Sequence, residues 1–109
     1  MATVTDLAIR ALRKSNNLGA EETASAADLQ LAVETVKAVH GYLKSKDLLR
    51  WTLNDIPQEA EMPYVLMTAF YLQSEFEQAQ NASFWSLGLD QIMGIVALPA
   101  IGVTQAEYF

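Results

Sequence analysis

The chain has 109 residues, which is enough for one domain, and 51% of them are hydrophobic while only 18% are charged. It contains no cysteine, so disulfides and thiolate metal sites are excluded. The longest uncharged apolar stretch, residues 92–103, is shorter than the ~20 residues that a membrane-spanning helix needs, and Pro99 interrupts it. We therefore expect no membrane association.

The net charge of −6 is distributed unevenly along the chain. All seven Lys and Arg residues lie at or before Arg50, and from Trp51 onward there are seven acidic residues and no basic one. Duplex binding depends on Lys and Arg to neutralise phosphates, so the second half should repel nucleic acid. We expect the two halves to face different surroundings.

Thr3 marks the start of the first predicted helix, with Asp6 three residues later, where a carboxylate favours the helix N-terminus. Basic residues come late in this helix, and residues 15–19 end it. Its apolar residues recur at the spacing of one helix face. They are Val4, Leu7, Ala8, Ala11 and Leu12.

The second predicted helix follows Ser25, a capping residue with Asp28 three positions on. Its apolar stripe is broad and continues to Leu43, so a large part of its surface should be covered by other elements. Residues 47–57 then predict a connector, because Pro57 disfavours helical backbone at the residue before it.

Two further helices are predicted in the second half of the chain. Pro63 fits the first turn of a third helix that ends near Gln78. Asn81 or Ser83 is the expected cap of a fourth helix, which Gly88 and later Gly94 would weaken.

Residues 97–109 differ in character from the rest, because Pro99 and Gly102 are expected to exclude a regular helix. We predict an all-α fold, a small bundle of three to four helices spanning residues 1–96, with an extended C-terminal docking arm over 97–109. Such an arm can become ordered on another chain. Its apolar and aromatic residues are the candidate contacts: Ile101, Val103, Tyr108 and Phe109.

Residues for catalysis are scarce, so we expect no enzyme. His40 is the single histidine and lies on an apolar helical stripe, where a packed or interface role is expected. The five glycines are scattered and form no phosphate-binding loop. No catalytic, cofactor-binding or metal-ligating set can be assembled from these residues, and we expect none.

Three basic residues close together, Arg10, Arg13 and Lys14, are the remaining candidate site. They favour the helix dipole at the end of the first helix, and they also suit contact with an acidic protein surface. A helix, a turn and a second helix superficially resemble a DNA-binding motif, but the second helix has few of the polar residues that read bases. A partner-docking role is the interpretation that we prefer.

Several segments together resemble the head-to-tail adaptors of tailed bacteriophages, also called head-completion, connector or packaged-DNA-stabilisation proteins. They are Thr-Asp-Leu-Ala-Ile-Arg-Ala-Leu-Arg-Lys (5–14), Leu-Gly-Ala-Glu-Glu-Thr (18–23), Ser-Ala-Ala-Asp-Leu (25–29), the segment 51–57, and Met-Thr-Ala-Phe-Tyr-Leu (67–72). The resemblance covers roughly residues 3–80 and consists of helix starts and apolar positions.

The resemblance implies a structural virion protein made in the cytoplasm of the bacterial host. Its helical protomers would form a ring, commonly of twelve copies, beneath the portal protein. The ring would extend the DNA channel, help to retain packaged DNA and support a tail or second connector protein. DNA would pass through without sequence-specific binding. The C-terminal arm and the basic cluster would then dock on the portal or on a neighbouring subunit.

Two other functions are left open by the residues themselves. A small helical DNA-binding regulator would use the basic cluster on the first helix, and its affinity would fall steeply with salt. A helical interaction module of a toxin–antitoxin or secretion system would form a stable dimer instead of a ring.

Overall fold

Side-chain caps start the first two helices where the sequence predicts. In the computed structural model, which describes residues 3–19 and 22–108, with backbone alone for 97–108, α1 spans Val4–Lys14 and α2 spans Ala26–Ser45. The Asp6 N–H donates to the Thr3 hydroxyl at 3.1 Å, and the Thr3 N–H donates to the Asp6 carboxylate at 3.0 Å. Ser25 caps α2 by accepting from the Asp28 N–H at 3.2 Å. These predictions are confirmed.

The connector after α2 contains a short 3₁₀ turn, η1 (Leu53–Asp55), and leads into α3 (Gln58–Glu75). Pro63 was expected in the first turn of this helix, and that prediction is wrong, because α3 starts five residues earlier at Gln58. The early start has a tertiary cause. Ala60 is fully buried and Glu61 forms an ion pair with Arg10 of α1, so contacts hold the first turn in place before the proline is reached.

The fourth helix, α4 (Ala82–Tyr108), begins at the predicted cap, since the Ser83 N–H donates to the Asn81 side-chain carbonyl at 3.0 Å. Its backbone stays helical through Pro99 and Gly102, so the expectation that these residues exclude a regular helix is wrong. Nucleating a helix is costly, but extending an existing one adds a hydrogen bond for each residue fixed. Pro99 removes one backbone hydrogen bond from the ladder, and the helix continues on the turns formed before it.

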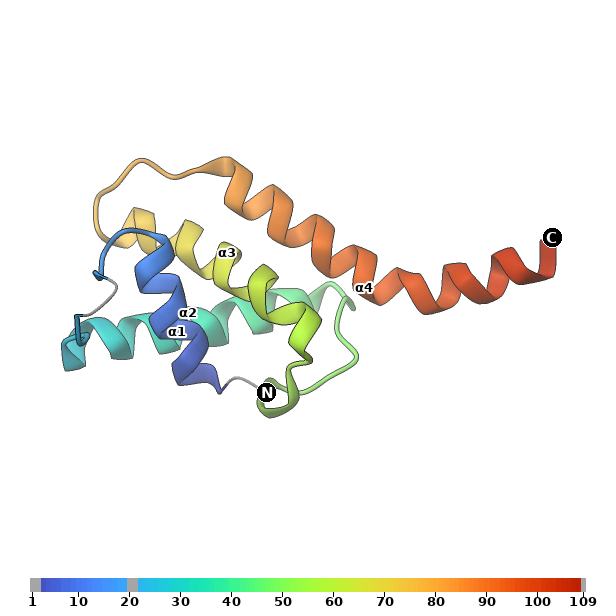
Figure 1. The fold of residues 1–109 in the computed structure, drawn as a ribbon, viewed down its shortest axis with the longest axis horizontal. Helices are drawn as coiled ribbons and strands as arrows, with labels where there is room; N and C mark the ends of the chain where they lie inside the picture. Colours follow the sequence, from blue (N-terminus) through green and yellow to red (C-terminus); the bar gives the residue numbers. More distant parts are fainter. Residues whose placement is uncertain (1–2, 20–21, 109) are drawn as a thin grey trace.

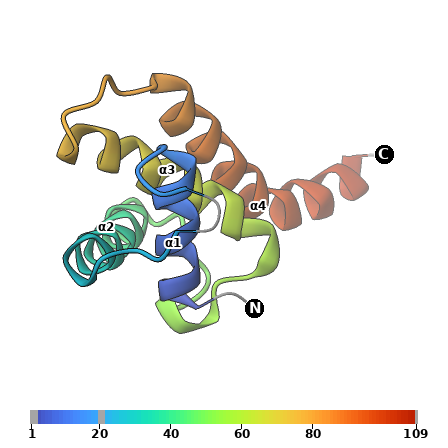
Figure 2. The ribbon, with the colours of Figure 1, turned by 60° about the vertical axis from the view of Figure 1, so that its left-hand side comes forward.

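The helices are arranged around α3, which packs against α1, α2 and α4 (Figure 1). Beyond α3, α4 continues past the end of the bundle, and the view in Figure 2 also shows its C-terminal part directed away from α2. The molecule measures 53 × 27 × 26 Å along its principal axes because of this projection. The described residues form an all-α bundle of four helices without a strand.

The core lies where α1, α2 and α3 meet, and Tyr64 is the largest of its fully buried side chains. All residues from 63 to 69 of α3 are buried, so two turns of this helix are enclosed on every side. Buried apolar residues of all four helices line the core. They include Leu7, Leu12, Val36, Leu43, Leu72 and Ile92.

Gly88 sets the close approach between α3 and α4. A Cβ atom at this position would lie 2.6 Å from Met67 Cγ and 3.0 Å from the Pro63 carbonyl oxygen, which is backbone. Only glycine therefore allows α4 to pack at this distance. Gly88 therefore lowers the intrinsic helix propensity of α4 but allows α4 to pack closely against α3.

Candidate functional site

The predicted basic cluster is brought together on one side of α1. Arg10, Arg13 and Lys14 are spaced three and four residues apart, so they share a helix face. With Met62 and Val65 of α3 they line an open depression between the two helices. Met62 is 45% exposed, which leaves an apolar centre beside the cations.

The three cations do not have equal roles. The Arg10 guanidinium lies 2.9 Å from the Glu61 carboxylate in a half-buried ion pair that joins α1 to α3. Arg13 and Lys14 are exposed, and the Lys14 ammonium lies 5.4 Å from the centre of the Phe84 ring of α4. Arg10 therefore links α1 to α3, and among the described residues of this cluster the unpaired outward positive charge comes from the other two.

The predicted C-terminal contacts lie far along α4, away from the basic cluster. Ile101, Val103 and Tyr108 belong to the turns of α4 that project past the bundle (Figure 1). The structure describes only the backbone there, and Phe109 lies outside the described residues. The two groups of candidate residues are therefore not parts of one site, and the role of the second group stays a prediction.

His40 belongs to a half-buried polar network at the edge of the core, which its sequence position alone did not reveal. The Trp51 ring N–H donates to the Tyr64 hydroxyl oxygen at 3.1 Å, and His40 Nδ1 lies 2.7 Å from the same oxygen. Trp51 can only donate, so the Tyr64 proton is available to His40. This arrangement favours a neutral imidazole that accepts at Nδ1 and carries its proton on Nε2.

The pKa shifts in this network agree with that assignment. Burial lowers the pKa of His40 below its ordinary value of 6.5, and the nearby Lys44 ammonium lowers it further. Burial also raises the pKa of Tyr64 to about 12, with the hydrogen bond from Trp51 acting in the opposite direction. At neutral pH both groups are uncharged, which suits an internal hydrogen-bonded tie between α2, the connector and α3.

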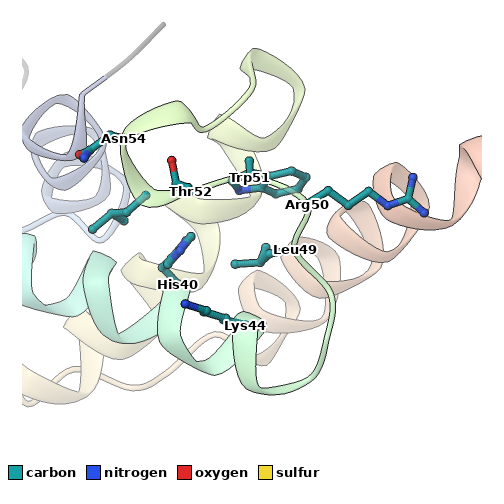
Figure 3. A pocket seen from close by; sticks show the side chains of 8 residues that line it. His40, Lys44, Leu49, Arg50, Trp51, Thr52 and Asn54 are labelled. Carbon is teal, nitrogen blue, oxygen red and sulfur yellow. The ribbon is translucent and has the colours of Figure 1, made fainter.

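An open depression of about 680 Å³ lies above this network, between α2 and residues 49–54 of the connector (Figure 3). His40, Lys44 and Trp51 line this depression. The Arg50 side chain extends away from His40 and Lys44. The Nδ1 atom of His40 is engaged by the Tyr64 hydroxyl, so the ring is held in place where it lines the depression.

Aromatic side chains gather further along α3, about two turns after Tyr64, where sequence reasoning identified no cluster. The Trp85 ring lies 5.2 Å from Tyr42, 5.4 Å from Tyr71 and 5.7 Å from Phe70, so it joins α2, α3 and α4. A neighbouring groove between α2 and α3 is lined by side chains that include two exposed carboxylates. Its lining is Glu34, Thr35, Ala38, Tyr71 and Glu75.

Within the described residues, no group of three or more His, Cys, Asp or Glu side chains is placed to hold a metal ion. Among the helices in the part of the chain that the structure describes, none combines the length and the apolar character needed to span a bilayer.

Comparisons with known proteins found no match of any kind. No protein-family model matches the chain. Searches of curated proteins and of solved structures also found no match.

Proposed function

We propose that this chain is a head-to-tail adaptor of a tailed bacteriophage: a structural virion protein that forms a ring beneath the portal and extends its DNA channel. In that position the ring helps to retain packaged DNA and offers a platform to a tail or second connector protein. The proposal rests on the resemblance over residues 3–80, on the all-α bundle, and above all on the shape of α4.

The projecting part of α4 is the observation that carries the proposal. Residues 91–106 contain no charged side chain, and the C-terminal part of α4 runs beyond the bundle (Figure 1). An apolar helical segment of this kind is unfavourable in water and favours a second protein surface. In an adaptor, that surface is the portal, and Ile101, Val103, Tyr108 and Phe109 are the proposed contacts.

The charge distribution supports a channel-forming role in place of tight DNA binding. The chain from Trp51 onward has seven acidic residues and no basic one, so it repels a phosphate backbone. Repulsion of this kind lets DNA slide through a pore without being captured. The ion pair of Arg10 with Glu61 also weakens the alternative of a DNA-binding regulator, because one of its three candidate cations is already paired.

Electron microscopy tests the proposal directly. The full-length chain is mixed with the portal ring encoded in the same genome, and the portal alone serves as reference. We expect an added ring of density beneath the portal, and we expect a chain ending at residue 96 to lose it while keeping a cooperative unfolding transition. Absence of the added ring contradicts the proposal.

The regulator is tested with a DNA duplex in place of the portal. The adaptor should show no tight duplex binding even at low salt. Affinity that falls steeply as salt rises, together with no density on the portal, would establish the regulator instead.

A further inference from the structure

Two surfaces on opposite sides of α3 are complementary in charge, and each has an apolar or aromatic residue at its centre. The first, which we call the basic face, consists of Arg13, Lys14, Met62 and Val65. Its two cations are exposed, and Met62 is 45% exposed between α1 and α3.

The second surface, which we call the acidic face, consists of Glu34, Ala38, Tyr71 and Glu75. Both carboxylate residues are exposed, one on α2 and one on α3. Tyr71 is 36% exposed, and its ring packs edge-on against Trp85 at 5.4 Å, which holds it in place. Tyrosine is enriched among the residues that contribute most of the binding energy at protein interfaces.

One copy of the chain cannot bring its own two faces together. Met62 and Tyr71 are nine residues apart on α3, which is two and a half turns, so their side chains project from opposite sides of the same helix. A contact between the basic face of one copy and the acidic face of another is therefore heterologous. Each copy keeps one unused face, and the contact repeats until it closes into a ring or grows as an open chain.

We propose that the basic face binds the acidic face of a second copy of this chain, with Arg13 and Lys14 beside Glu34 and Glu75 and with Met62 against Tyr71. The charge complementarity of the two faces argues for a second copy as the occupant. The inference deepens the proposed function and rests on it for the closed ring. It assigns the subunit contact to the bundle and leaves the projecting part of α4 for the portal.

The contact is measured on the full-length protein alone, by sedimentation over a concentration series at about 0.1 M salt, where charges closer than ~10 Å still interact. We expect the mean mass of the wild type to rise with concentration. The reversals R13E/K14E and E34K/E75K each place like charges opposite one another, which should weaken self-association at least ~10-fold. Thermal unfolding of each variant confirms that it is folded.

An equal mixture of the two variants provides the decisive comparison. The reversed basic face of one variant then meets the reversed acidic face of the other, and both remaining faces are also complementary. We expect the mixture to regain association that neither variant shows alone. The variant K44E/R50E changes the net charge by the same amount as R13E/K14E but lies outside both faces, so it should associate like the wild type.

Three outcomes would overturn the inference. They are a wild-type chain that stays monomeric up to about 1 mM, association that both reversals leave unchanged, and a mixture that fails to recover. The result is independent of portal docking. If the chain associates through these faces but never binds the portal, the proposed function fails and the contact stands; if it binds the portal without this contact, only the inference fails.

Discussion

Helices α3 and α4 are both rich in apolar residues, yet they differ in how much of that surface is covered. Residues 63–69 of α3 are buried without interruption because three other helices surround them. In α4 the side facing α3 is buried at Ile92, whereas Leu87 is 50% and Met93 is 48% exposed. Apolar composition therefore does not distinguish a helix that is enclosed in the core from one that buries only part of its apolar surface.

Truncating one leucine in each helix should give the largest contrast. Leu72 of α3 is fully buried, so Leu72→Ala leaves a cavity and should lower the free energy of unfolding by about 2–5 kcal/mol. Leu87→Ala in α4 removes the same atoms from a half-exposed site and should change the free energy of unfolding by less than about 1 kcal/mol. Urea unfolding measures both, and equal losses would contradict the difference between the helices.

Two glycines of α4 sharpen the comparison within one helix. Gly88→Ala places a methyl group against Met67 and the Pro63 carbonyl oxygen, so α4 must move away from α3, at a cost of about 1–3 kcal/mol. A Cβ at Gly94 would meet nothing within 4 Å, so Gly94→Ala should stabilise by about 0.5–1 kcal/mol through better helix propensity. Urea unfolding should show a lower free energy of unfolding for Gly88→Ala and a higher one for Gly94→Ala. If both substitutions raise it, α3 and α4 do not approach closely at Gly88.

Thr68 carries a buried polar group in the enclosed part of α3. Its hydroxyl is buried and has no hydrogen-bond partner among the described residues. Thr68→Val keeps the shape and removes the unsatisfied group, so it should stabilise the protein by about 1 kcal/mol. Thr35→Val is the matched control, because that hydroxyl donates to the Leu31 carbonyl at 2.8 Å, and its loss should be neutral or mildly destabilising. Calorimetry measures the thermal stability of both variants against the wild type. If Thr68→Val is less stable than the wild type, the Thr68 hydroxyl has a hydrogen-bond partner.

The smallest expected effect is a dependence of stability on pH from the His40 network. Because the pKa of His40 is lowered in the folded state, the unfolded chain takes up the proton first as pH falls below 6.5. Stability should therefore be full above pH 6.5 and should decrease below it until the folded-state pKa of His40 is passed. Thermal unfolding between pH 5 and 8 measures this decrease.

The control for this prediction is His40→Asn, which offers Tyr64 a carbonyl acceptor that does not titrate. The variant should lose the decrease below pH 6.5. A decrease that persists in the variant would assign it to another group. Asp6 acts in a separate window, since hydrogen bonds from Thr3 lower its pKa below 3.8, and stability from that source is lost only as pH falls through the lowered value.

The beginnings of α1, α2 and α4 were predictable from sequence because each depends on neighbours within three residues. Thr3, Ser25 and Asn81 each accept a backbone N–H from two or three positions ahead. The basic cluster was predictable for the same reason, since the spacing of Arg10, Arg13 and Lys14 places them on one helix face.

The start of α3 and the polar network of His40 were not predictable, because they depend on partners far away in the chain. Arg10 and Glu61 are 51 residues apart, and His40 and Tyr64 are 24 apart. No local pattern marks either pair. The acidic face likewise exists only because α2 and α3 lie side by side.

The sequence by itself determined the all-α class, the caps, the uneven charge and the scarcity of catalytic residues, because these follow from composition and from contacts along one helix. The tertiary structure decided which apolar helix is enclosed and which continues past the bundle, how Gly88 seats α4, and which charged residues face outward. Those features depend on packing between helices, where a half-buried partner such as Glu61 makes an apparent surface cation part of a contact between α1 and α3.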